Sequence, residues 1–114
     1  WSPAIERRFI AKLRAAQLME SSLDRLFEIA RDHPTAAVRA ALFELATEGD
    51  ESVRYAFGAF LLYLHGHSEE WYGFGEGHRP HLLALKGTPQ EQTAARAWLA
   101  KRIAAPLRDD AGTP

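Results

Sequence analysis

Apolar residues recur along this chain at intervals of three and four, the spacing that places them on one side of an α-helix. The turns between these segments are about 2–4 residues long, and short turns make neighbouring helices pack antiparallel. The pattern predicts an all-α fold of about five to six helices, stacked as antiparallel helical hairpins. The residues expected to face the core are Ile5, Phe9, Leu13, Leu23, Leu26, Phe27, Ala30, Val38, Ala41, Leu42, Leu45, Val53, Phe57, Phe60, Leu61, Leu64, Ala95, Trp98, Leu99 and Ile103.

Residues that cap helix N-termini precede each of these segments. Hydroxyl and carboxylate side chains accept a hydrogen bond from the first free backbone N–H groups of a helix. Residues 88–91, Thr-Pro-Gln-Glu, also have the form of a capping box. Gly49 is expected to end the third helix in the left-handed conformation. The expected capping residues are Ser2, Ser21, Thr35, Asp50 and Thr88.

Composition sets the size and class of the protein. The chain has 114 residues, of which 46% are apolar and 25% charged, values that suit one globular domain. We expect this domain to cover residues 1–108, with a frayed tail at residues 109–114. Cysteine is absent, which excludes disulfides and zinc–thiolate sites and fits a cytoplasmic location. The longest apolar run, residues 57–64, is far shorter than the roughly 20 residues that span a bilayer, so no membrane interaction is expected.

Charge is distributed unevenly along the chain. Residues 1–19 carry four basic side chains against one acidic, residues 20–76 carry eleven acidic against four basic, and residues 77–114 carry six basic against three acidic. An acidic block can attract a basic partner. Nucleic-acid binding requires a dense basic stripe, and the basic residues here are confined to the two ends. The sequence therefore predicts a protein partner and no nucleic acid.

Residues 34–42 and 49–57 share a pattern of a turn, a cap, Val-Arg, a small residue and a large apolar residue. This pattern resembles the HEAT-repeat signature, and the resemblance covers roughly residues 20–65. In that family the valine packs inward, and the arginine ties its helix to the preceding turn, often through an aspartate. The resemblance implies these roles for Val38 and Val53, for Arg39 and Arg54, and for Asp32 and Asp50. HEAT units repeat after about 30 residues or more, whereas this pattern recurs after 15.

Residues 65–81 interrupt the helical pattern and are expected to form an irregular loop. They contain four of the five histidines and four of the eight glycines. In one interpretation Trp71, Tyr72 and Phe74 plug the open end of the helical stack. In a second interpretation the same aromatic residues bind a partner, because tryptophan, tyrosine and arginine dominate interface hot spots.

A third interpretation of this loop is a metal or catalytic site. His65, His67, His78 and His81, with Glu76, have side chains able to bind Zn²⁺ or another divalent ion. Their spacing matches no known metal motif, and Pro80 argues that His78 and His81 do not share a regular helix. No nucleophile motif or phosphate-binding glycine signature accompanies them. We therefore assign no metal ligand, catalytic residue or cofactor.

The segment from Trp71 to Leu83, followed by residues 88–103, resembles the ends of small bacterial HEAT-type proteins of contact-dependent toxin–immunity pairs. This resemblance implies a non-enzymatic immunity or antitoxin-type inhibitor that binds a basic toxin, such as a nuclease. The alternatives are a metal-binding domain or metal-dependent enzyme that uses loop 65–81, and a fragment of a larger helical scaffold. The residues predicted to contact the partner are Glu48, Glu51, Glu69, Glu70, Trp71, Tyr72, Phe74, Glu76 and Arg79.

Overall fold

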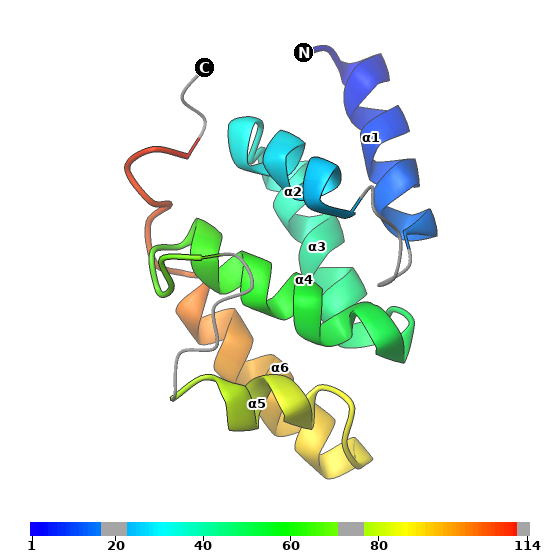
Figure 1. The fold of residues 1–114 in the computed structure, drawn as a ribbon. Coiled ribbons are helices and arrows are strands. Elements are labelled where there is room, and N and C mark those ends of the chain that lie inside the picture. Colours follow the sequence, from blue (N-terminus) through cyan, green and yellow to red (C-terminus); the bar gives the residue numbers. More distant parts are fainter. Residues whose placement is uncertain (17–22, 71–76, 112–114) are drawn as a thin grey trace.

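The computed structural model describes residues 1–16, 23–70 and 77–111. These residues form six α-helices and no strand, which confirms the all-α fold (Figure 1). None of these helices is long and apolar enough to cross a bilayer. The stacked-hairpin order stays a prediction. The helices are α1 (Pro3–Ala15), α2 (Leu23–Asp32), α3 (Ala36–Glu48), α4 (Glu51–Leu64), α5 (Arg79–Ala84) and α6 (Pro89–Arg102).

The helices begin where the capping residues predict. Ser2, Thr35 and Asp50 each accept a hydrogen bond from a backbone N–H in the first turn of α1, α3 and α4. Thr88 and Glu91 form the reciprocal capping box of α6. Ser21, the expected cap of α2, lies outside the described residues. Local side-chain chemistry therefore fixes four of the six helix starts.

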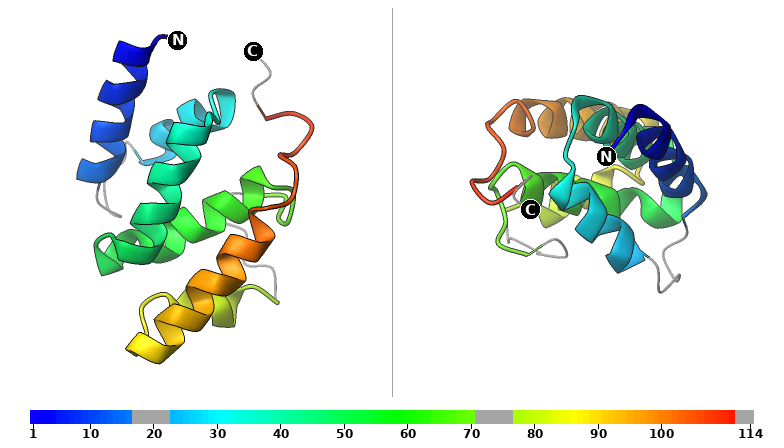
Figure 2. Two further views of the ribbon diagram at one scale, coloured as in Figure 1. Left: turned by 180° about the vertical axis from the view of Figure 1, so that it is seen from behind. Right: turned by 90° about the horizontal axis from the view of Figure 1, so that it is seen from above.

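Helix α4 is the centre of the fold. Helices α2 and α3 lie on one side of it and α5 and α6 on the other, while α1 packs against α3 (Figures 1 and 2). Every residue from Ala56 to Leu64 is buried, on all sides of α4. A helix that is apolar all round requires neighbours on every side, which explains its central position. Nearly all buried hydrophobic side chains of the described residues form one cluster that includes residues of all six helices.

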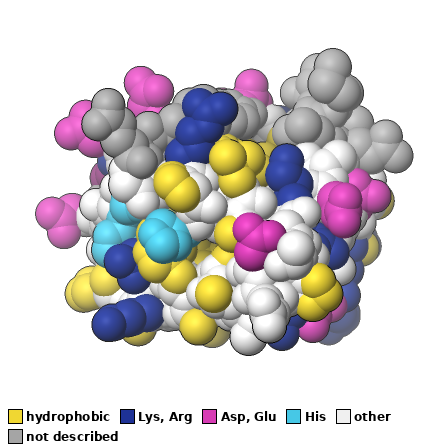
Figure 3. Space-filling view, turned by 90° about the horizontal axis from the view of Figure 1, so that it is seen from below, with side chains coloured by type: hydrophobic (Ala, Val, Ile, Leu, Met, Phe, Trp, Pro, Cys, Tyr) yellow, Lys and Arg dark blue, Asp and Glu magenta, His cyan; other side chains and the backbone are white. Residues whose placement is uncertain are grey.

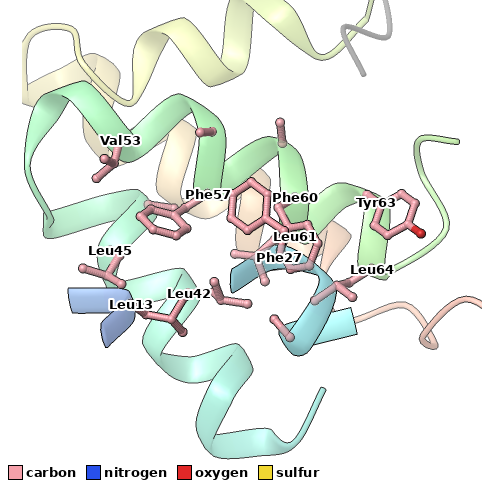
Figure 4. Close-up of a cluster of buried hydrophobic side chains, with 14 of the residues drawn as sticks. Leu13, Phe27, Leu42, Leu45, Val53, Phe57, Phe60, Leu61, Tyr63 and Leu64 are labelled. Carbon is pink, nitrogen blue, oxygen red and sulfur yellow. The ribbon is translucent and has the colours of Figure 1, made fainter. Parts of the chain in front are cut away.

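Aromatic side chains attach α2 to α4. Phe27 is fully buried, and its ring stacks on that of Phe60, with centroids 4.3 Å apart and planes 5° apart. The edge of Phe27 also meets Phe57 at a centroid distance of 5.7 Å. Figure 4 shows these rings between the two helices, beside Leu42 of α3. A helix of only ten residues such as α2 is therefore held mainly by tertiary packing.

Three sequence predictions need correction. Gly49 has a φ of −75° and is not left-handed; glycine fits there because a Cβ would lie 2.5 Å from the carbonyl oxygen of Leu45. Among the glycines that the structure describes, the left-handed one is Gly66, with a φ of +77°. Ile5 is 47% exposed, because α1 packs on the core through Phe9, Leu13 and the partly buried Ile10. The irregular loop ends earlier than residue 81, since α5 begins at residue 79.

Arg39 and Arg54 tie their helices to the preceding turns through backbone carbonyls. The Nε of Arg39 donates to the oxygen of Pro34 at 3.0 Å, and that of Arg54 to the oxygen of Gly49 at 2.8 Å. Side chains on a helix point back toward its N-terminus, so a long donor in the second turn reaches the residue before the cap. The expected acceptors, the two aspartates, have other roles: Asp32 pairs with Arg31, and Asp50 caps α4.

Arg54 makes a second bond that Arg39 lacks. Its Nη1 donates to the carbonyl oxygen of Leu85, just after α5, at 3.1 Å. One guanidinium thus joins the start of α4 to the end of α5. In α6, Gln92 makes the same helix-to-turn hydrogen bond as the two arginines. Its Nε2 donates to the carbonyl oxygen of Gly87, in the turn before the helix, at 2.8 Å.

Candidate functional site

The acidic residues predicted to bind a partner lie at two separate ends of α4. Glu48 and Glu51 flank the turn between α3 and α4, and both are exposed. Glu69 and Glu70 are also exposed and follow the other end of α4. The 14 residues of α4 span roughly 20 Å, so the two groups do not form one patch.

The aromatic part of the predicted site is not described by the structure. Trp71, Tyr72, Phe74 and Glu76 all lie outside the described residues. Arg79 is the first residue of α5 and is exposed. The described part of the site therefore consists of carboxylates and one arginine.

Ion pairs between helices offset part of the uneven charge along the sequence. Arg14 of α1 pairs with Glu44 of α3, with Nη2 and Oε2 3.0 Å apart. Arg96 of α6 approaches Glu48, at the end of α3, to 3.6 Å. These two ion pairs thus join the acidic helix α3 to the basic helices α1 and α6. Part of the acidic block is neutralised within the molecule, which the sequence blocks alone do not reveal.

A few carboxylates remain without such a partner. Most acidic side chains accept a hydrogen bond or pair with a cation, as Glu28 does with Arg25 and Glu91 does within its capping box. Within residues 1–16, 23–70 and 77–111, those with neither kind of partner are Glu51, Glu69, Glu70 and Asp109.

Residues 102–108 bring Asp109 to the same end of α4 as Glu69 and Glu70. The backbone N–H of Arg108 donates to the carbonyl oxygen of Leu64 at 2.8 Å. The guanidinium carbon of Arg108 also lies 3.9 Å from the centroid of the Tyr63 ring. Figure 1 shows the segment after α6 running along this end of α4. We call Glu69, Glu70 and Asp109 the acidic end.

His65 is a structural residue at this junction. It is only 5% exposed, and its Nδ1 lies 2.7 Å from the carbonyl oxygen of Ala105. Since a carbonyl only accepts hydrogen bonds, Nδ1 carries the proton. Burial lowers the pKa of His65, an effect that the bond to Ala105 partly opposes and that nearby Arg39 reinforces. A neutral, buried imidazole therefore fastens the segment after α6 to the end of α4.

Two of the other loop histidines contact Trp98 of α6, and the third bonds to the end of the same helix. The ring of His81 stacks on Trp98 with centroids 4.3 Å apart, and His78 meets it edge-on at 5.6 Å. His67 donates from Nε2 to the carbonyl oxygen of Arg102 at 2.8 Å. Figure 3 shows the face that carries α5 and α6, where histidine side chains gather beside hydrophobic and basic ones.

These contacts show what the histidines do in the described structure. They stack on an aromatic ring or bond to backbone carbonyls. Among the described residues, no three histidine, aspartate or glutamate side chains are placed to hold a metal ion. Glu76, the carboxylate considered as a ligand, lies outside the described ranges. The described residues alone therefore do not form the predicted metal site.

Comparisons with protein-family models, with curated proteins and with solved structures found no match for this chain. The functional argument therefore depends on the geometry above.

Proposed function

We propose that this protein is a non-enzymatic protein-binding module whose contact surface is the acidic end. The observation that carries the proposal is that Glu69, Glu70 and Asp109 have no partner within the described chain, whereas most other carboxylates do. Glu69 and Glu70 are followed directly in the sequence by an aromatic segment that includes Trp71 and Tyr72.

This combination suits a basic protein partner. Exposed carboxylates steer a positively charged protein toward the site and raise the association rate. Aromatic residues that become buried on binding contribute most of the affinity and slow dissociation. The most concrete form of the proposal is a cytoplasmic immunity or antitoxin-type inhibitor of a basic toxin such as a nuclease. This form rests on the resemblance of residues 71–103 to small immunity proteins.

Two charge-reversal variants test the proposal. Glu69→Lys/Glu70→Lys reverses charge at the acidic end, and Glu48→Lys/Glu51→Lys makes the same change at the other end of α4. Each tagged protein is used to capture its partner from cells of the source organism. The captured partner is then identified by mass spectrometry and titrated by calorimetry, while circular dichroism shows that both variants are folded.

We expect Glu69→Lys/Glu70→Lys to weaken binding by about tenfold or more, because two attractive charges become repulsive. Glu48→Lys/Glu51→Lys should change the affinity much less. Equal binding by the wild type and the Glu69→Lys/Glu70→Lys variant would contradict the proposal, as would a partner of acidic composition.

A further inference from the structure

A groove lies between α1 and α2, and its residues are distant in sequence from those of the acidic end. It is open to solvent and has a volume of about 280 Å³. Its floor and walls are apolar, and two basic side chains stand beside them. The residues that line it are Trp1, Ile5, Arg8, Phe9, Lys12 and Ile29.

The groove contains much of the exposed hydrophobic surface of the described chain. The large hydrophobic residues exposed among residues 1–16, 23–70 and 77–111 are Trp1 at 45%, Ile5 at 47% and Leu83 at 45%. Two of these three line the groove. Adjacent exposed hydrophobic residues, unlike isolated ones, are typical of binding surfaces.

Arg8 and Lys12 give the groove its charge. They stand four residues apart on α1, and like charges at this spacing repel each other. Neither has an ion pair with any residue of the described ranges, whereas Arg14 on the same helix pairs with Glu44. An anionic group bound between Arg8 and Lys12 would relieve this repulsion.

We propose that this groove docks an acidic amphipathic helix of a partner protein. A large apolar side chain of that helix packs between Trp1 and Ile5, above Phe9 and Ile29. Carboxylates one turn apart on the helix pair with Arg8 and Lys12, whose positions differ by about 6 Å along α1. This arrangement is helix-in-groove recognition, in which apolar anchors supply affinity and flanking charges set orientation.

The groove and the acidic end are independent surfaces. The acidic end suits a basic partner, whereas the groove suits an acidic one, so the failure of either proposal leaves the other standing. Nucleic acid is a weaker candidate for the groove, because an apolar floor with two cations offers few phosphate contacts.

The probe is a fluorescein-labelled helical peptide of about 16 residues, long enough to lie along the whole of α1. It carries leucine and phenylalanine on one face, with glutamate pairs four residues apart beside them. A second peptide keeps the apolar face and replaces each glutamate by lysine. Fluorescence anisotropy measures the binding of both peptides to the full chain, at low salt and at physiological salt.

We expect the acidic peptide to bind and the lysine peptide to bind at least about tenfold more weakly. Arg8→Glu/Lys12→Glu should weaken the acidic peptide by a similar factor. The matched control, Arg7→Glu/Lys101→Glu, changes the net charge equally outside the groove and should leave the affinity nearly unchanged. Ile5→Ser, at an exposed position, should weaken binding of the acidic peptide without unfolding α1.

Several results would overturn the proposal. These are no binding of the acidic peptide, equal binding of both peptides, or equal effects of the two charge-reversal variants. Light scattering that shows a dimer dissolved by Arg8→Glu/Lys12→Glu would assign the groove to a second copy of this chain. A single-stranded oligonucleotide that displaces the acidic peptide from the wild type would assign the groove to nucleic acid.

Discussion

The guanidinium of Arg54 should stabilise the fold more than that of Arg39, although both make the same helix-to-turn tie. Arg54 donates both to the carbonyl of Gly49, in the turn that precedes α4, and to the carbonyl of Leu85 at the end of α5. Within the described ranges, Arg39 donates only to the carbonyl oxygen of Pro34. Replacing each arginine by methionine removes the donors and keeps most of the apolar stem.

The expected magnitudes follow from the number of bonds lost. A hydrogen bond to a charged donor contributes about 1.5–3 kcal/mol, and half-buried sites such as these fall at the lower end. Arg39→Met should therefore cost about 1.5 kcal/mol of unfolding free energy, and Arg54→Met about 3 kcal/mol. The loss from Arg54→Met is a large fraction of the roughly 5–15 kcal/mol that stabilises a domain.

Urea unfolding followed by circular dichroism measures these free energies by linear extrapolation. Arg96→Met is the control, because Arg96 makes only an exposed ion pair with Glu48 and should cost at most about 1 kcal/mol. If Arg54→Met and Arg39→Met cost the same, the bond to Leu85 contributes nothing, and the reasoning is refuted.

Three other changes give distinct results. Phe27→Ala should cost about 3–5 kcal/mol and Phe27→Leu about 1–2 kcal/mol in urea unfolding, because alanine leaves a cavity beside Phe60; equal losses would show that α2 does not depend on this ring. The pKa of His65 is lowered in the folded state, so the unfolded chain binds the proton first as the pH falls. The stability that neutral His65 contributes is therefore fully present above a pH of about 6.5 and is lost as the pH falls below that value. His65→Gln should remove that part of the pH dependence, as measured by urea unfolding at several pH values; an unchanged pH profile would contradict the role of this imidazole. Thr88→Ala should cost about 1 kcal/mol and increase amide hydrogen exchange in the first turn of α6, since it breaks the capping box; unchanged exchange there would refute this account.

The sequence predicts the helices well because their signals are local. The caps Ser2, Thr35, Asp50 and Thr88 act on N–H groups within three residues, and each one marks a helix start in the structure. The spacing of apolar residues likewise predicts Val38, Ala41, Leu42 and Leu45 on the buried face of α3, although it misses Ala46 and Thr47.

Features that depend on distant contacts could not be predicted in this way. Ile5 has helical spacing with Phe9, yet the position of α1 at the edge of the fold leaves it exposed in a groove. The ion pair of Arg14 with Glu44 joins residues 30 positions apart, so the sequence does not show that part of the acidic block is neutralised.

The contacts of residues 102–108 make the structure of the acidic end depend on residues that are synthesised late. The carbonyl groups of Arg102 and Ala105 accept hydrogen bonds from the imidazole N–H groups of His67 and His65, and the backbone N–H of Arg108 donates to the carbonyl of Leu64. A ribosome must therefore synthesise α6 and the segment after it before the end of α4 can take its final form. Termination of translation before residue 102 would leave Glu69 and Glu70 in the chain but would remove the contacts that hold the end of α4.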